Sequence, residues 1–237
     1  MNRFLIFLAA VVGCLSCRKP FNVQHFQETI IIDSVSLDTT LKPMKKHTQI
    51  GYYPVYYIGP LQDTIRLGEK LPSHGENKNF QDFVLRSLDQ VTLTVDTSIK
   101  LNNLTIFESY RTGDDTFAKR VDSIIKEPAY AIILQNRSDS TLFLGHFNYL
   151  RSMVMQYQDQ SGKWKDVENA AFAYDACLTF AKNIVVGPKQ ILVAKLIRYE
   201  GDFTPLCRLK LMNFDQTCYS NTFHFKLDKS IINQNQL

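Results

Sequence analysis

The chain has 237 residues and a formal net charge of +4, and 45% of its residues are hydrophobic. That length suits one large or two small domains, and that hydrophobic content is sufficient for a real core. The basic residues are scattered, with one short cluster at 42–46, which excludes an extended nucleic-acid-binding stripe. The 16 Phe and 11 Tyr, against a single Trp, suit β-sheets.

An apolar run at 4–12 follows a short cationic start and ends just before Cys14. It is too short to cross a hydrocarbon core of about 30 Å, but it has the length of a signal-peptide core. Val11-Val12-Gly13 before Cys14 resembles the lipobox of bacterial lipoproteins, whose cysteine receives a diacylglycerol. We predict a signal peptide over 1–13 and lipidation at Cys14. Cys17 is the alternative, and an ordinary secretory signal with incidental cysteines is the other interpretation.

Residues 14–49 are predicted to be a tether that contains one strand at 29–37. Residues 50–126 are predicted to form a β-rich region, in which Pro54 favours an edge strand. Its expected strands lie at 51–59, 63–67, 89–95 and 104–110, with a loop at 69–79. Apolar residues at helical spacing predict a short helix or an irregular strand at 80–88 and a short helix at 117–125.

Turn signals become regular over residues 127–230, ahead of a tail at 231–237. Strands are expected at 130–135, 141–144, 152–158, 163–167, 184–186, 190–199, 207–212 and 221–227. This spacing predicts a mainly β protein whose C-terminal half is an immunoglobulin-like antiparallel β-sandwich. Alternation within these strands predicts a buried core made of Ile132, Leu134, Leu142, Leu144, Met153, Met155, Trp164, Leu192, Leu196, Leu209, Leu211, Phe223 and Phe225.

Three further cysteines, Cys177, Cys207 and Cys218, follow the signal region. An exported protein meets an oxidising compartment, so we predict one disulfide among them. The sequence leaves all three pairings open. Cys207–Cys218 could close a hairpin, although Cys207 is in phase with Leu209 whereas Cys218 is out of phase with Phe223, so the pair would need a bulge.

No nucleophile elbow, phosphate loop or closely spaced Cys/His pair occurs, so no catalytic residue, cofactor site or metal site is predicted. The five histidines are isolated from the cysteines, and His224 is expected to point outward. Tyr52, Tyr53, Tyr56 and Tyr57 are the candidate binding residues. On a strand, Tyr53 and Tyr57 would share one face and Tyr52 and Tyr56 the other. An exposed pair would suit a glycan or a protein partner, whereas packing on the sheet is the alternative.

Three C-terminal segments, 199–203, 207–211 and 219–223, together with 57–65, resemble uncharacterised lipoproteins of Bacteroidota. The resemblance implies a sheet fold and a cell-envelope location, and no activity. Basic residues at 18–19, where surface-export signals of that group are acidic, favour an outer-membrane position facing the periplasm. We expect a non-catalytic binding or accessory module, held to the membrane by its lipid, with a protein or glycan partner and no nucleic acid. A structural or pilus-like scaffold is the alternative, and an envelope enzyme with a site outside known motifs is a third.

Overall fold

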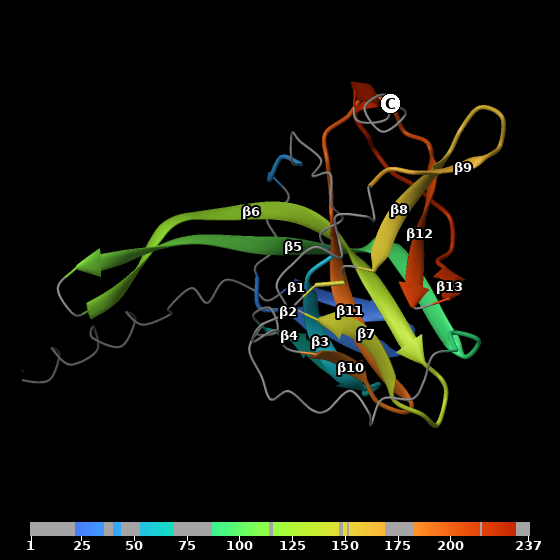
Figure 1. Cartoon of the computed structure of the whole chain (residues 1–237), viewed down its shortest axis with the longest axis horizontal. Helices are drawn as coiled ribbons and strands as arrows, with labels where there is room; N and C mark the ends of the chain where they lie inside the picture. The colour runs from blue at the N-terminus through green and yellow to red at the C-terminus, as the bar shows by residue number, and fades with distance from the viewer. Residues whose placement is uncertain are drawn as a thin grey trace, which may run out of the picture.

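The computed structural model describes residues 22–35, 40–43, 53–68, 87–113, 116–146, 149–150, 152–168, 183–213 and 215–230. This part of the chain is mainly β, as predicted, and contains several antiparallel sheets (Figure 1). Its strands are β1 (Asn22–Phe26), β2 (Thr29–Asp33), β3 (Val55–Pro60), β4 (Thr64–Leu67), β5 (Val91–Gly113), β6 (Thr116–Asn136), β7 (Leu142–His146), β8 (Met153–Gln158), β9 (Trp164–Asp166), β10 (Asn183–Val186), β11 (Gln190–Ile197), β12 (Leu206–Asn213), β13 (Gln216–Tyr219) and β14 (Phe223–His224).

A four-stranded antiparallel sheet in the order β3-β11-β6-β5 occupies the middle of the molecule. Its side chains enter two separate hydrophobic clusters, one on each face, so the sheet is covered on both sides. This explains why β11 is apolar almost throughout instead of alternating, because a strand with two buried faces has no solvent side. Pro54 precedes β3, which is the edge strand expected from the sequence.

The first cluster lies between this sheet and a second one in the order β13-β12-β8-β9, to which β14 adds beside β12. Strands β7 and β10 form a separate pair that also contributes to the cluster. All of the predicted core residues except Trp164 belong to the first cluster, which confirms the strand phases there. Trp164 is only half-buried, because its side chain lies outside the core. Its ring packs against the guanidinium of Arg208, whose carbon is 4.2 Å from the ring centre.

The second cluster lies between the central sheet and a small sheet in the order β1-β2-β4. Ile31 and Ile65 are buried in this cluster, and β2 runs parallel to β4. Residues 22–33, which we expected within a tether, are therefore folded onto the body as a hairpin. The domain boundary expected at residue 126 falls inside β6, which pairs with β5 on both sides of that residue. Residue 126 therefore does not divide the described structure into two units.

The predicted helix at 117–125 is wrong, because these residues belong to β6. Their apolar residues recur at helical spacing, yet every residue of this segment except Asp122 lies opposite a residue of β5. In the described residues, helical backbone occurs only at 229–230. The segment at 80–88, expected to be a short helix or an irregular strand, lies largely outside the described residues, and its last residues, Ser87 and Leu88, are neither helix nor strand.

Candidate functional site

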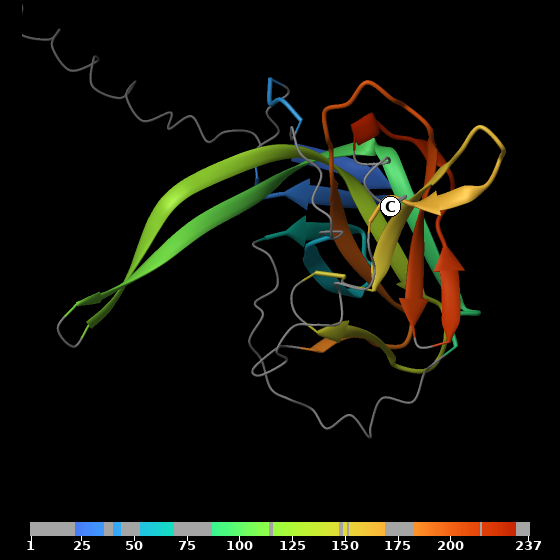
Figure 2. The ribbon, with the colours of Figure 1, turned by 45° about the horizontal axis from the view of Figure 1, so that its top comes forward.

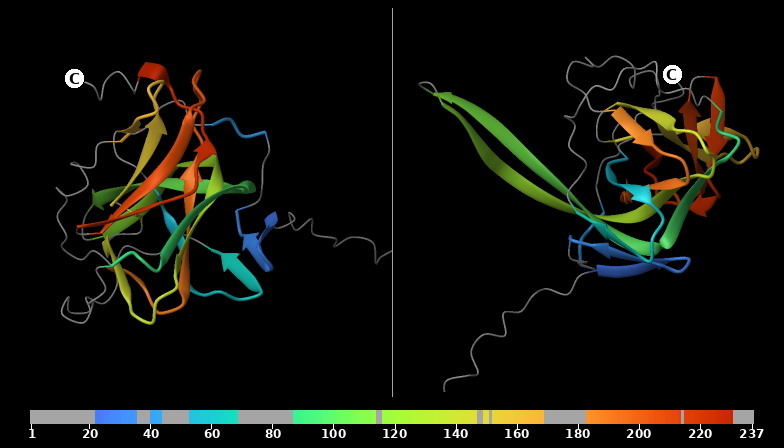
Figure 3. Two further views of the ribbon diagram at one scale, coloured as in Figure 1. Left: turned by 90° about the vertical axis from the view of Figure 1, so that its right-hand side faces the viewer. Right: turned by 90° about the horizontal axis from the view of Figure 1, so that it is seen from below.

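Strands β5 and β6 continue well beyond the sheet and form a two-stranded arm. The last residue of β6 that pairs with β11 is Ala129, so we define the arm as residues 102–113 of β5 and 116–128 of β6. At about 3.3 Å per residue the arm is roughly 40 Å long. It curves away from the rest of the strands, as Figure 1, Figure 2 and the right view of Figure 3 show.

Three aliphatic side chains of the arm are open to solvent. Ile124 is 58% exposed, and Ile106 and Ile125 are each 43% exposed. Ile106 lies directly opposite Ile124, so these two share one face of the ribbon, whereas Ile125 lies on the other face opposite Thr105. In the described residues, no third strand pairs with either edge of the arm. A long ribbon with apolar side chains and two open edges is a natural surface for strand pairing.

A cluster of buried polar residues, which we call the base of the arm, lies where the arm leaves the central sheet. The Tyr56 hydroxyl donates to Asn103 Oδ1 at 2.7 Å, and Asn103 Nδ2 donates to Glu127 Oε2 at 2.8 Å. Thr105 Oγ1 also donates to Glu127 Oε2, at 3.3 Å. Tyr56, Asn103 and Glu127 are buried, and they come from β3, β5 and β6. These hydrogen bonds fix the two strands of the arm to the central sheet where the arm leaves it.

An ion pair without solvent access lies beside this base. Lys195 Nζ is 2.8 Å from Asp33 Oδ2, and both side chains are 0% exposed. Lys195 Nζ also donates to the carbonyl of Asn102 at 2.7 Å and lies 3.9 Å from the centre of the Tyr56 ring. Asp33 Oδ1 accepts a hydrogen bond from the backbone N–H of Val35 at 3.0 Å. The pair joins β11, at the centre of the sheet, to β2 in the small sheet.

Sequence reasoning missed this pair, since its members are far apart along the chain and match no motif. A signal was nevertheless present. Lys195 interrupts the otherwise apolar run 191–197, and Asp33 directly follows three isoleucines. A charged residue inside a strand that has no solvent face needs a buried counter-charge.

The tyrosines predicted to form a binding surface are largely interior. Tyr53 is buried in the first cluster and Tyr56 in the second. Tyr57 packs against the second cluster as well, so our assignment of Tyr53 and Tyr57 to one face is wrong. The cause is a register shift: Val193 lies opposite Tyr57 and Ala194 opposite Val55, so that Tyr56 is an extra residue in β3. Tyr52 lies outside the described residues.

A second buried carboxylate, Glu168, lies in the first cluster. The Tyr53 hydroxyl contacts both of its oxygens, at 2.8 and 2.7 Å, and Met155 N–H donates to Oε2 at 2.6 Å. Burial, and then the charge of Glu168, raises the pKa of Tyr53 well above its ordinary value. The same two causes raise the pKa of the Cys207 thiol to about 12. Cys207 is therefore a protonated thiol and a poor nucleophile.

Cys207 is expected to resist alkylation in the native protein at pH 8. Its thiolate fraction should be about a thousandfold below that of a thiol whose pKa is 9, and its side chain has no solvent access. Because the pKa is raised on folding, the contribution of Cys207 to stability is complete below pH 9 and is lost as pH rises toward 12. Mass mapping after iodoacetamide treatment tests this, with the urea-unfolded chain as the positive control. Equal labelling of native and unfolded protein would contradict the burial of Cys207.

Cys207 and Cys218 are both free thiols in the structure. Cys218 lies opposite Leu211, whereas Cys207 lies opposite Phe223 and Tyr157, so the two are not partners across the hairpin. Cys177, Cys14 and Cys17 lie outside the described residues, so pairing through Cys177 and lipidation remain predictions. His224 is exposed, as predicted.

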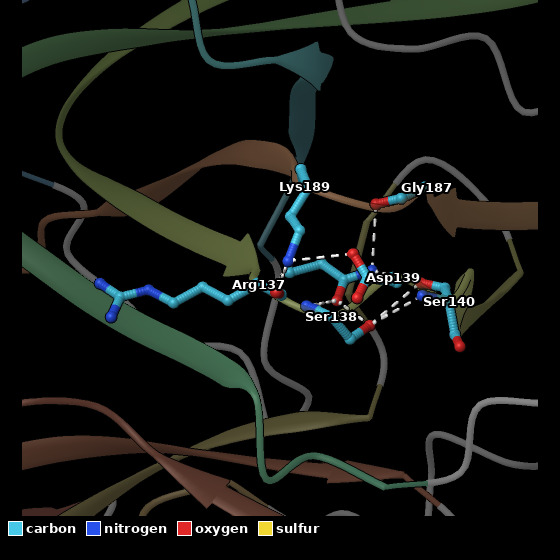
Figure 4. Close-up of polar contacts among 7 residues, drawn as sticks. Arg137, Ser138, Asp139, Ser140, Gly187 and Lys189 are labelled. Atoms are coloured by element: carbon cyan, nitrogen blue, oxygen red, sulfur yellow. Dashed lines mark hydrogen bonds and ion pairs between the residues drawn. The ribbon is translucent and has the colours of Figure 1, made fainter.

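A third polar cluster joins the β6–β7 turn to the β10–β11 turn (Figure 4). Asn136 Nδ2 donates to the carbonyl of Gly187 at 3.0 Å, and Asn136 Oδ1 accepts from the Ser138 hydroxyl at 2.7 Å. Lys189 Nζ donates to the carbonyl of Arg137 at 2.6 Å and lies 3.1 Å from Asp139 Oδ1. These contacts satisfy the backbone of two turns, so the cluster fastens the ends of strands together.

Within the described ranges, no group of three or more His, Cys, Asp or Glu residues is arranged to hold a metal ion. A helix with the length and apolar character needed to cross a bilayer is also absent from that part of the chain. No family model matches the chain, and neither a curated protein nor a solved structure matches it. The arm and the buried groups at its base are thus the features from which function must be argued.

Proposed function

We propose that this chain is a lipid-anchored, non-catalytic binding module of the cell envelope, whose arm pairs with an exposed strand of another envelope protein. The observation that carries the proposal is the arm itself. An isolated two-stranded ribbon is marginally stable in water, and open strand edges invite pairing. An additional strand on the arm would cover an open edge, and the partner's side chains could cover Ile106 and Ile124.

The charge of the arm favours a neutral partner surface. Residues 102–128 contain five acidic residues (Glu108, Asp114, Asp115, Asp122 and the buried Glu127) and four basic ones (Arg111, Lys119, Arg120, Lys126), so their net charge is −1. Neither a nucleic acid nor a strongly charged protein would be attracted over long range by such a segment. Backbone pairing and apolar contact are therefore the proposed basis of recognition, as in other cases of strand addition.

The proposed anchor would hold the body close to the membrane. β1 begins at Asn22, eight residues after Cys14, and eight residues reach at most about 28 Å. A body so close to the bilayer needs a projecting element to contact proteins farther away, and the arm is roughly 40 Å long. We also propose that the two sheets around the first cluster form an immunoglobulin-like sandwich, which provides a rigid support for the arm.

Site-specific photocrosslinking in intact cells tests this function. A photoreactive phenylalanine analogue at Ile124 should yield one discrete adduct with an envelope protein, whereas the same analogue at Thr222, exposed and outside the arm, should not. Ile106→Lys in the same chain should abolish the adduct, because it places a charge on the face that Ile124 shares. Cys14→Ala should reduce the adduct by releasing the protein from the membrane.

The composition of the adduct decides between the proposals. An adduct that contains a different envelope protein supports the binding module. An adduct that contains only copies of this chain supports the scaffold alternative instead, because the open edges of the arm could also pair with each other. The absence of an arm-specific adduct, with the protein at its normal level, would overturn both.

A further inference from the structure

We propose that Lys195 and Asp33 condense to form an intramolecular amide bond, an isopeptide, that joins β11 covalently to β2. The two reacting groups are already in contact, with Nζ 2.8 Å from Oδ2, and neither side chain has solvent access. The proposal concerns a modification of the fold and does not depend on the binding function proposed for the arm.

Amide formation requires the neutral amine and the neutral acid. An amine attacks only when its nitrogen has a free electron pair, and a carboxyl accepts attack more readily as the acid. Transfer of one proton from Nζ to Oδ2 along their hydrogen bond produces both forms at once. Because an ion pair removed from water loses much of its solvation, a buried site lowers the cost of this transfer relative to solution.

Three neighbours hold the reacting groups in place. The carbonyl of Asn102 accepts a hydrogen bond from Nζ at 2.7 Å, and the Tyr56 ring covers Nζ at 3.9 Å. The N–H of Val35 donates to Asp33 Oδ1 at 3.0 Å, where negative charge develops when the nitrogen attacks. Groups held in a reactive geometry reach effective molarities of about 10⁵–10⁸ M, and Nζ enters that geometry by moving from Oδ2 to the adjacent carboxyl carbon of Asp33.

The reaction balances without any other reactant. Nζ attacks the carboxyl carbon of Asp33, the new C–N bond forms, and the bond from that carbon to Oδ2 breaks. Two of the three ammonium protons leave with Oδ2 as water. The third stays on the amide nitrogen, where it can keep the hydrogen bond to the carbonyl of Asn102. In sum, one ammonium and one carboxylate give one amide and one water molecule.

Peptide mapping of the full chain, purified from membranes, tests the bond. Trypsin does not cleave after an acylated lysine, so residues 190–198 should remain intact and linked to the peptide that contains Asp33. The linked pair should be lighter than the sum of its two peptides by one water molecule. Lys189, whose exposed partner is Asp139, is the internal control and should be cleaved normally.

Two variants make the chemistry specific. Lys195→Arg keeps the positive charge but removes the nucleophile, and the linked peptide should disappear. Asp33→Asn keeps the carbon that is attacked, so a link formed with loss of ammonia instead of water would support the proposed attack. Recovery of unlinked peptides cleaved after Lys195, from native wild-type protein, overturns the proposal whatever the variants do.

Discussion

Replacing Lys195 by methionine is expected to lower the free energy of unfolding by about 3–5 kcal/mol, a large share of the roughly 5–15 kcal/mol typical of a domain. The methionine fills a similar volume but can form neither the ion pair nor the proposed amide, so it leaves the Asp33 carboxylate at 0% exposure with no cation beside it. A buried charge without a counter-charge is among the most destabilising features a fold can hold. Urea unfolding of the full chain in detergent, followed by circular dichroism, measures the effect.

Lys189→Met is the matched control. Lys189 also pairs with an aspartate, at 3.1 Å, but its side chain is 62% exposed and that of Asp139 is 91% exposed. Exposed pairs contribute only about 0–1 kcal/mol, because water screens the charges. If both variants lowered the free energy of unfolding by only about 0–1 kcal/mol, Lys195 would behave as a surface lysine. The packing of β2 against β11 through Asp33 would then be wrong.

The last strands of the C-terminal half could be predicted because they turn one face to the core and the other away from it, as β12 does. Leu209 and Leu211 alternate with the half-buried Arg208 and Lys210, and Phe223 and Phe225 alternate with exposed residues. Apolar residues at every second position therefore mark the buried face of such a strand. Trp164 was misplaced because a large aromatic residue on an alternating strand can also pack outside the core, here under Arg208.

The arm could not be predicted because three of its apolar residues, Ile106, Ile124 and Ile125, are exposed instead of buried in a core. Ile124 and Ile125 are adjacent and lie on opposite faces of a ribbon that the described body leaves open. Two residues of the helical pattern from Phe117 to Ile125, Ile124 and Ile125, are exposed, so at these positions the spacing does not reflect burial. Pairing with β5 decided the conformation instead, and that pairing is a tertiary interaction that periodicity alone does not report.

The small sheet and the ion pair were missed for a related reason. The β-branched residues at 29–33 indicate a strand. Its partner β4 begins 31 residues after the strand ends and runs parallel to it, and no local turn sequence predicts such a pairing. Asp33 and Lys195 are 162 positions apart. Contacts at such separation follow from the arrangement of whole sheets, so the sequence indicates only that each charge needs a partner.

Phe225→Ala is expected to cost about 3–5 kcal/mol of unfolding free energy, which for a domain of this size lowers Tm by roughly 6–20 °C. Phe225 is buried in the first cluster, where its ring meets Tyr130, Tyr199 and Phe223 edge-on at centroid distances of 6.0 to 6.5 Å. Truncation removes these ring contacts and leaves a cavity between the two sheets, which the backbone can close only in part.

His224→Ala is the control for Phe225→Ala, because His224 is the preceding residue and is exposed. Its loss should change stability by no more than about 0.5 kcal/mol. Thermal unfolding of the full chain, followed by circular dichroism, compares the two variants at matched protein concentration. A large loss for His224→Ala with a small one for Phe225→Ala would mean that the segment faces the core in the opposite phase. The two sheets could not then enclose the first cluster as described, because Phe223, which is in phase with Phe225, would also face solvent.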